Sequence, residues 1–170
     1  MFETTIHWVR DIPPHRLGLM ARPRGGDSLR EEVAAWQRAS LNIVVSLLEA
    51  KEIRELELQE EPALCAEHGI VFRHFPIPDR GTPASQRDAA TLIAELGSEL
   101  AAGKAVAIHC RAGIGRTGLI AGSLLHGLGV PGPNIFRLLS RSRGVAMPDT
   151  SEQADWVVQY AIGARRTPPR

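Results

Sequence analysis

Short runs of apolar and β-branched residues recur along the chain and predict strands. The run from Asn42 to Leu47 is rich in β-branched residues without a polar alternation, which favours a strand buried on both faces of a sheet. Three further short runs also predict strands. The four predicted strands are Leu17–Met20, Asn42–Leu47, Ile70–Phe75 and Ala105–His109.

Helical periodicity separates these strands. Ser28 with Glu31 three residues later has the pattern of a capping box, and apolar residues then recur on one helical face. Ser85 with Asp88 caps a longer amphipathic stretch, which Gly103 ends. The remaining predicted helices cover residues 62–67, 117–128, 133–142 and 150–162.

Residues 49–61 are strongly acidic, and we expect them to form a short helix and loop with a solvated face. Elsewhere strands alternate with helices, which predicts an α/β fold with a mostly parallel sheet. The 170 residues fit one domain, expected over residues 1–163, with a basic tail over 164–170. Because such sheets bind ligands beyond the carboxyl ends of their strands, the turn from Ile108 to Thr117 is the first place to search for a site.

Composition narrows the classes of function. Hydrophobic residues make up 44% and charged residues 23% of the chain, which are ordinary values for a globular protein. No apolar run approaches the roughly 20 residues that span a bilayer, and no basic and then apolar stretch of a secretory signal is visible. The two cysteines are too few for a disulfide scaffold, so we expect a reducing, cytoplasmic compartment. The net charge of +1 argues against a nucleic-acid partner.

The charge is unevenly distributed along the chain. Residues 1–103 hold 11 Lys and Arg against 16 Asp and Glu, whereas residues 104–170 hold 9 against 3. An anion site is therefore easier to place in the last third. Arg137, Arg141 and Arg143 lie there in a predicted helix and turn. They either line a surface for an anionic substrate or only keep the helix solvated.

The turn from His109 to Gly118 carries the strongest chemical pattern. Cys110 leaves a buried strand, five residues intervene, and Arg116 opens a helix. The amides of a tight loop before a helix converge on an anion, and Gly113 and Gly115 permit close approach of the backbone. A guanidinium binds two phosphate oxygens at once. The same field favours a thiolate at Cys110, placed to attack phosphorus.

This turn resembles the His-Cys-x5-Arg-Ser/Thr signature of the cysteine-dependent protein tyrosine phosphatases. Three further segments resemble the kinase-associated phosphatase group within the dual-specificity branch: Leu17–Leu19, Phe75–Pro83 and Val145–Gln153. The resemblance covers most of the chain, from about Ile12 to Tyr160. It implies a single-domain tyrosine-phosphatase-like sandwich, in which helices flank a mainly parallel sheet of four to five strands.

The resemblance also implies roles within the loop. Cys110 is the expected nucleophile, which forms a cysteinyl-phosphate intermediate. Arg116 and the loop amides are expected to bind the phosphoryl oxygens. These amides belong to Arg111, Ala112, Gly113, Ile114, Gly115 and Arg116. The side chain of Arg111 is a further candidate for widening the positive rim.

Four residues outside this cradle receive supporting roles from the resemblance. Asp79 lies on a proline-rich loop that can swing over the site yet stay stiff, and it is expected to protonate the leaving oxygen and later to activate water. Thr117 is expected to stabilise the departing thiolate, and His109 to hold the loop through hydrogen bonds rather than act as an acid. Gln153 resembles a glutamine that positions water in tyrosine-specific members, although glutamines near a helix start are often only solvated.

The resemblance predicts hydrolysis of phosphotyrosine in phosphoproteins, with phosphoserine and phosphothreonine as further substrates. The aspartate loop, however, reads Ile77-Pro78-Asp79 rather than Trp-Pro-Asp, and the aromatic clamp of the larger tyrosine-specific enzymes is not recognisable. Two alternatives stay open. One is a phosphatase of phosphoinositides or other small phosphomonoesters with the same mechanism, and the other is a phosphate-binding module without turnover.

We expect neither a cofactor nor a metal, because no histidine has ligand spacing with a second histidine or cysteine on one helix face. The expected partner is a phosphoprotein substrate, with neither nucleic acid nor membrane, and a monomer is favoured. Cys65 has two open interpretations: a small buried apolar side chain, or a partner for a reversible disulfide with Cys110.

Overall fold

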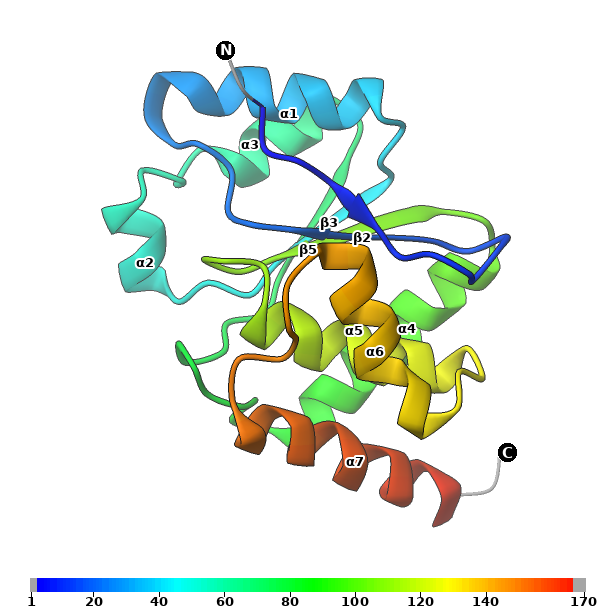
Figure 1. Ribbon diagram of the computed structural model, residues 1–170. Coiled ribbons are helices and arrows are strands. Elements are labelled where there is room, and N and C mark those ends of the chain that lie inside the picture. Colours follow the sequence, from blue (N-terminus) through cyan, green and yellow to red (C-terminus); the bar gives the residue numbers. More distant parts are fainter. Residues whose placement is uncertain (1–2, 167–170) are drawn as a thin grey trace.

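A five-stranded sheet forms the centre of the molecule, with the strands in the order β1-β2-β5-β3-β4 (Figure 1). The structure is a computed structural model that describes residues 3–166. β1 pairs antiparallel with β2, and the other neighbours are parallel, which confirms the predicted mostly parallel α/β fold. The strands are β1 His7–Trp8, β2 Arg16–Met20, β3 Ile43–Ser46, β4 Val71–His74 and β5 Ala105–His109.

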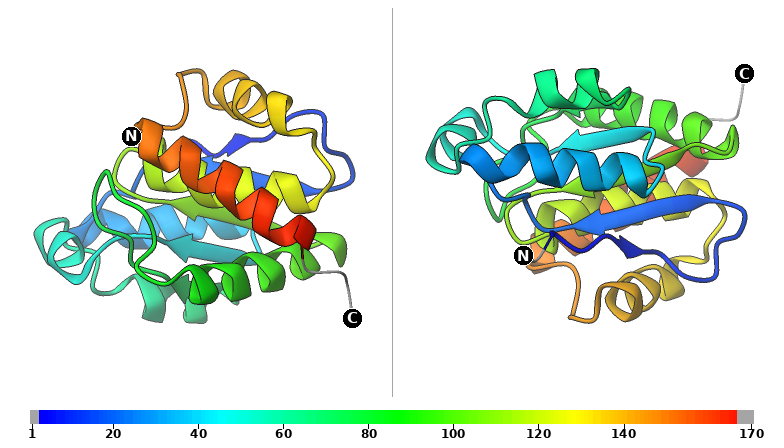
Figure 2. Two further views of the ribbon diagram at one scale, coloured as in Figure 1. Left: turned by 90° about the horizontal axis from the view of Figure 1, so that it is seen from below. Right: turned by 90° about the horizontal axis from the view of Figure 1, so that it is seen from above.

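Helices cover both faces of this sheet (Figure 2). One side carries α1 Leu29–Arg38, preceded by a 3-10 turn at Gly26–Ser28, and α3 Glu61–Glu67. The other side carries α4 Gln86–Ala101, α5 Gly115–Gly127, α6 Gly132–Arg143 and α7 Ser151–Arg166. The short α2 Ala50–Glu55 follows β3. Among the helices of residues 3–166, none has both the length and the apolar character that crossing a bilayer requires.

Alternate residues of the central strands feed two separate hydrophobic clusters. In β3, Ile43 and Val45 belong to the cluster under α4, α5, α6 and α7, whereas Val44 belongs to the cluster under α1 and α3. The same alternation holds in β5, where all five residues are buried. Burial on both faces is why these strands read as continuous apolar runs in the sequence.

The two cysteines lie in different clusters. Cys110 belongs to the cluster under α4 and α5, and Cys65, on α3, belongs to the cluster on the opposite face of the sheet. Both are free thiols. Burial, with the nearby charge of Glu61, raises the pKa of Cys65 to about 12. This environment is typical of a small buried apolar side chain, the first of the two interpretations of Cys65.

Side-chain caps support one of the two predicted capping patterns. At the start of α4, the amide of Asp88 donates a hydrogen bond to Ser85 Oγ at 3.1 Å, as the sequence predicts. At α1 the Ser28 side chain makes no capping hydrogen bond, so the predicted box with Glu31 is not formed. Glu31 lies instead 3.7 Å from a guanidinium nitrogen of Arg24.

The last helix is longer than the sequence predicts. α7 continues through Gly163, where we expected the helix to end, and runs to Arg166. Residues 164–166 of the expected basic tail are therefore helical, because a helix tolerates a single glycine at a cost of about 1 kcal/mol relative to alanine. Residues 167–170 of that tail lie outside the described residues.

The prediction of a solvated face for residues 49–61 is wrong for two of its glutamates. Glu52, in α2, is 6% exposed, and Glu61, at the start of α3, is 1% exposed. A buried carboxylate is stable only when a charged or hydrogen-bonding group compensates it. Both compensating groups, described below, lie where β5 leads into α5. The acidic segment therefore packs against the candidate site.

Candidate active site

The site lies beyond the carboxyl ends of the parallel strands, where the sequence placed it. Ser46 and His109 are register partners at the ends of β3 and β5. The amide of Leu47 donates to the carbonyl oxygen of His109 at 3.0 Å, and the amide of Arg22 donates to that of Arg111 at 3.1 Å. These bonds fix both sides of the loop that leads from β5 into α5.

Gly113 allows this loop to turn tightly. Its φ is +72°, a conformation that side chains disfavour. A Cβ atom added there would lie 2.2 Å from the carbonyl oxygen of Met20, in β2. Only glycine therefore satisfies both the backbone conformation and the close packing of the loop against the sheet.

Two hydrogen-bond donors point at the sulfur of Cys110. Thr117 Oγ1 lies 3.1 Å from Cys110 Sγ, and the amide of Gly113 donates to the same sulfur at 3.3 Å. The cysteine is 2% exposed. Donors aimed at a sulfur stabilise its anionic form, so the arrangement is suited to a thiolate.

The guanidinium of Arg116 is buried and held in place by acceptors on two sides. Its two terminal nitrogens donate to both carboxylate oxygens of Glu52, at 2.7 and 2.8 Å. They also donate to the carbonyl oxygen of Ile77 at 3.0 Å and to Asp79 Oδ1 at 3.1 Å. The remaining nitrogen, Nε, is buried and has no hydrogen-bond partner within residues 3–166. A buried unpaired donor is uncommon in a folded protein and requires an explanation.

Glu52 is a site residue that the sequence analysis missed. Burial alone raises the pKa of its carboxyl, but the hydrogen bonds from Arg116, the amide of Glu49 and Arg111 outweigh that effect and lower the pKa to about 2. Glu52 is therefore ionised at neutral pH and orients Arg116 through a bidentate ion pair. Its position near the start of a short acidic helix gave no distinguishing signal.

This ion pair predicts a pH dependence of stability. Because the folded-state pKa of Glu52 lies below its ordinary value of 4.5, the pair contributes stability fully above about pH 4.5 and loses it as the pH falls toward 2. Glu52→Gln is expected to lower the free energy of unfolding by about 3 kcal/mol at pH 7, because it leaves Arg116 without its main counter-charge. The difference from the wild type, measured by urea unfolding, should shrink toward pH 2. Glu55→Gln, a half-exposed neighbour in α2, serves as the control and should change little.

A second buried ion pair supports the start of the loop. His109 Nε2 lies 2.6 Å from Glu61 Oε1, and its Nδ1 lies 3.3 Å from the carbonyl oxygen of Cys110. Burial lowers the pKa of His109, but the charge and hydrogen bond of Glu61 outweigh burial, and the pKa is raised overall. A protonated ring donates from both nitrogens, so His109 ties α3 to the loop. This geometry agrees with a structural role for His109 and leaves it no access to a ligand.

One cavity of about 200 Å³ brings most of the predicted site residues together. It also includes two residues that the sequence analysis did not single out, Arg80 and Asp149. Gly113, Ile114, Thr117 and His109 support the loop without lining the cavity. The lining residues are Asp79, Arg80, Cys110, Arg111, Ala112, Gly115, Arg116, Asp149 and Gln153.

The start of α7 holds the aspartate loop against this cavity. Gln153 is completely buried, which excludes the solvated interpretation. Its Nε2 donates to the carbonyl oxygen of Gly81 at 3.1 Å, and its Oε1 accepts from the amide of Thr150 at 3.1 Å. Arg80 and Asp149 form an ion pair at 3.3 Å across the same gap. Asp79, on the same loop, lines this cavity together with Cys110, while its own side chain stays 58% exposed.

The two arginines singled out near the loop have defined partners. Arg111 lies 3.3 Å from Glu52 Oε1 and 3.3 Å from Glu55 Oε2, so two carboxylates offset the charge expected at the rim. Arg143, at the end of α6, donates to the carbonyl oxygens of Ala112 and Gly113 at 2.9 and 3.2 Å. It contacts the loop, a role that neither interpretation of the late arginines included.

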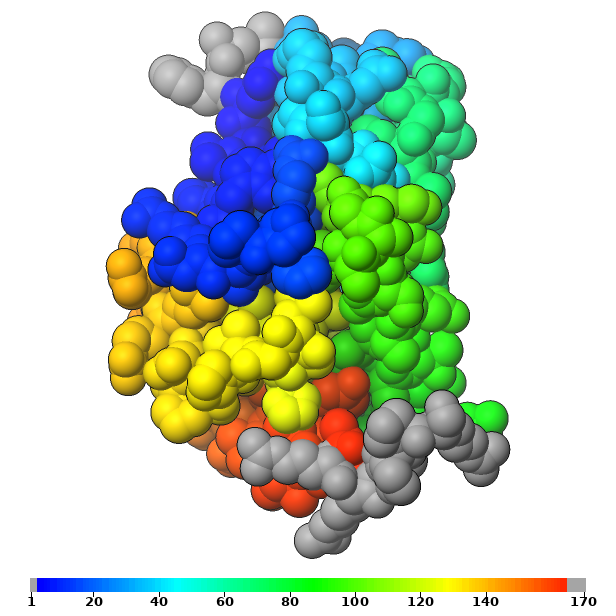
Figure 3. All heavy atoms as spheres, turned by 90° about the vertical axis from the view of Figure 1, so that its right-hand side faces the viewer, coloured from blue at the N-terminus to red at the C-terminus, as the bar shows by residue number. Residues whose placement is uncertain are grey.

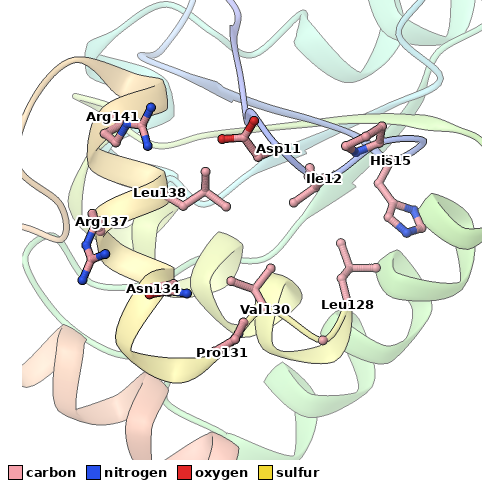
Figure 4. Close-up of a pocket in the computed structure, with 12 residues that line it drawn as sticks. Asp11, Ile12, His15, Leu128, Val130, Pro131, Asn134, Arg137, Leu138 and Arg141 are labelled. Carbon is pink, nitrogen blue, oxygen red and sulfur yellow. The ribbon is translucent and has the colours of Figure 1, made fainter.

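A second cavity, larger than the one around Cys110, lies elsewhere on the described residues. About 530 Å³ in volume, it lies between the turn after β1 and the connection from α5 to α6, which meet on the surface in dark blue and yellow (Figure 3). Arg137 and Arg141 line it together with Asp11 and His15 (Figure 4). Part of its wall, Leu128 to Pro131, follows the end of α5 that is opposite the catalytic loop. Because it contains no cysteine and none of the donors around Cys110, its size does not make it the reactive site.

Comparison with families identifies one match. The family described as "Polymorphic toxin system, DSP-PTPase phosphatase" matches residues 18–128. That range contains Asp79, Cys110 and Arg116 but ends before Arg143 and Gln153. Comparison with curated proteins gives no match.

Solved structures of phosphatases share the fold. Kinase-associated phosphatase, with its catalytic-site cysteine substituted by serine, superposes with a TM-score of 0.86 at 20% identity over 99% of both chains. The active form of Tk-PTP has a TM-score of 0.74 at 22% identity, over 92% of this chain and 96% of that one. PTPMT1 in complex with PI(5)P has a TM-score of 0.71 at 17% identity, over 94% and 99%. At these identities the likeness shows the fold.

Proposed function

This chain belongs to the DSP-PTPase phosphatase family of polymorphic toxin systems, and from this premise we propose that it hydrolyses phosphotyrosine in phosphoproteins, with phosphoserine and phosphothreonine as further substrates. Family and fold make it a dual-specificity-type cysteine phosphatase, a hydrolase that acts on a phosphorylated substrate. The observation that carries the proposal is the buried Nε of Arg116, which has no partner within residues 3–166 and belongs to a residue that lines the same cavity as Cys110. A phosphoryl oxygen is the acceptor that this donor lacks.

In the proposed binding step, the phosphoryl group enters the cavity above Cys110. Arg116 Nε donates to one of its oxygens, and the inward-facing amides of residues 111–116 donate to the others. The ion pair with Glu52 keeps the guanidinium fixed while this happens, so little conformational freedom is lost on binding.

In the first chemical step, the thiolate of Cys110 attacks phosphorus in line with the bond to the leaving oxygen. The S–P bond forms as the P–O bond breaks, and Asp79 transfers its proton to the departing oxygen. Asp79 starts 3.1 Å from Arg116, so the incoming phosphoryl group competes with it for the guanidinium. The exposed carboxyl group is then free to turn toward the leaving oxygen.

In the second step, water attacks the phosphorus of the cysteinyl-phosphate. The new P–O bond forms as the S–P bond breaks, and Asp79 takes the proton from water. The departing thiolate regains the hydrogen bond of Thr117, 3.1 Å away in the free protein. Gln153 is the proposed positioner of this water, because it lines the cavity and is anchored to the aspartate loop at Gly81.

The charges around the cavity favour a single phosphoryl group over a polyphosphorylated ring. Glu52 and Glu55 offset the charge of Arg111, and Asp149 offsets that of Arg80. Among the residues that line the site, Arg116 is thus the cation with a buried donor that has no partner. A phosphoinositide carries further phosphates that would need additional cations at the rim.

A panel of substrates tests this choice. We expect kcat/KM to be highest for a phosphotyrosyl peptide and at least about tenfold lower for inositol phosphates. A phosphothreonyl peptide should lie between them. Activity should persist in EDTA, since no step uses a metal. Highest activity on an inositol phosphate would favour the lipid-type alternative, and binding of all substrates without phosphate release would favour the module without turnover.

The setting of the enzyme follows from its nucleophile. We propose that it acts in the cytoplasm, because a catalytic cysteine must stay a free thiol, which needs a reducing environment. We also propose that it acts as a monomer. The proposed phosphatase domain comprises residues 1–163.

A further inference from the structure

Arg143 links the end of α6 to the catalytic loop through three contacts. Its Nη2 donates to the carbonyl oxygen of Ala112 at 2.9 Å and its Nε to that of Gly113 at 3.2 Å. Its Nη1 lies 3.2 Å from His7 Nε2, on β1. Burial and the Arg143 charge lower the pKa of His7, so the neutral ring accepts this hydrogen bond. The planar guanidinium is thus fixed on both sides.

The geometry of the peptide unit gives these contacts a consequence for the site. In a trans peptide the carbonyl oxygen and the following amide hydrogen point in opposite directions. The peptide bonds after Ala112 and Gly113 are both trans. When Arg143 holds the two carbonyl oxygens on the outside of the loop, the amides of Gly113 and Ile114 must face the inside. For Gly113 this is observed directly, since its amide donates to Cys110 Sγ at 3.3 Å.

We propose that Arg143 is a positioning residue that fixes these two peptide units, so that their amides face the sulfur and the bound phosphoryl group. The proposal rests on the proposed phosphatase function and adds to it a residue that touches neither substrate nor sulfur. A loop containing two glycines has little intrinsic preference for one peptide orientation, because glycine adopts positive and negative φ values about equally readily. The two hydrogen bonds from Arg143 supply that preference.

The fork geometry explains why arginine stands here. Two carbonyl oxygens on successive residues accept from two nitrogens of one rigid guanidinium, which a single ammonium group cannot match. The neighbouring Arg141 offers a matched comparison. It lies on the same helix, is exposed, and has no side-chain hydrogen bond or ion pair with the rest of residues 3–166. Loss of its charge alone leaves the loop untouched.

The experiment compares Arg143→Ala, Arg143→Lys and Arg141→Ala. Binding of inorganic tungstate, a phosphate-shaped oxyanion, is measured by calorimetry, and alkylation of Cys110 by iodoacetamide is followed against pH. Arg143→Ala is expected to bind tungstate about 10–100-fold more weakly, less than the 10²–10³-fold effect of removing an oxyanion donor outright in catalysis. Its alkylation profile should move to higher pH, because one donor to the sulfur is no longer held. Arg143→Lys should recover only part of both properties, and Arg141→Ala should match the wild type.

Thermal unfolding, measured in parallel, separates this role from a general loss of structure. The proposal would be overturned if folded Arg143→Ala kept the tungstate affinity and the alkylation profile of the wild type. It would also be overturned if Arg143→Lys recovered both properties fully, because the effect would then be one of charge. Both readouts are independent of turnover. A wild-type protein that binds tungstate and has a reactive thiol but hydrolyses no ester would therefore contradict the proposed function and leave the Arg143 comparison decisive.

Discussion

Replacing Cys110 with serine is expected to lower turnover of every phosphate ester by on the order of 10⁶-fold, to background. The serine hydroxyl keeps its proton at neutral pH, and no base lies beside it among its hydrogen-bond partners, which are the donors Thr117 and Gly113. Binding of phosphate or tungstate should persist, because Arg116 and the loop amides are unchanged. Initial rates on a phosphotyrosyl peptide and calorimetric titration with tungstate measure the two properties.

Cys65→Ala is the matched control for this variant. It removes the other thiol from the opposite face of the sheet and should keep kcat near the wild-type value. Substantial turnover by Cys110→Ser would show that Cys110 is not the nucleophile. Inactivity of Cys65→Ala in a folded protein would point to chemistry at the second thiol.

Asp79→Asn is expected to lower kcat on phosphotyrosyl peptides by about 10²–10⁴-fold, the usual contribution of a positioned acid. Asparagine cannot donate a proton to the leaving oxygen, so the alkaline limb of the pH profile should flatten. An activated aryl phosphate needs less protonation and should show a much smaller loss. Because the change also removes the carboxylate 3.1 Å from Arg116, inhibition by inorganic phosphate should become stronger.

Asp149→Asn provides the comparison for this prediction. Asp149 lines the same cavity, but its carboxylate pairs with Arg80 rather than with Arg116. It should lose far less activity than Asp79→Asn and keep the alkaline limb. Equal losses in the two variants, or none at Asp79, would mean that the acid is assigned to the wrong residue.

The parts of the fold that follow from local patterns could be predicted from the sequence. The central strand Ala105–His109 has the predicted bounds, because a strand buried on both faces leaves a continuous apolar run. The loop after it was recognisable because its chemistry is compressed into ten consecutive residues, His109–Gly118. The two-residue strand His7–Trp8 was missed, since its pairing with β2 rather than its own pattern defines it.

Long-range pairing explains the errors at charged residues. Glu52 and Glu61 belong to a segment whose acidic character predicts solvation, yet their partners lie 64 and 48 positions away, at Arg116 and His109. A sequence pattern within one element carries no trace of such a pairing. A carboxylate that lies beside a buried cationic side chain is buried with it as an ion pair, even when the adjacent residues in the sequence are solvated.

The same limit applies to the contacts of two residues that the sequence analysis did single out, Gln153 and Arg143. Gln153 and Arg143 both lie beyond residue 128, and each reaches back across the fold to a backbone carbonyl. Gln153 holds the aspartate loop at Gly81, and Arg143 holds the cysteine loop at Ala112. Two late helices thus stabilise the two loops that meet in the cavity, although neither helix carries the nucleophile.

The central claim is that the sulfur of Cys110 and the guanidinium of Arg116 face one bound oxyanion. A crystal structure of the protein with orthovanadate measures this directly. The account predicts vanadium bonded to Cys110 Sγ, with Arg116 Nε and the Gly113 amide donating to its oxygens. The account would be contradicted if vanadate bound elsewhere, for instance in the cavity lined by Arg137 and Arg141, and left Cys110 unbonded and Arg116 Nε unpaired.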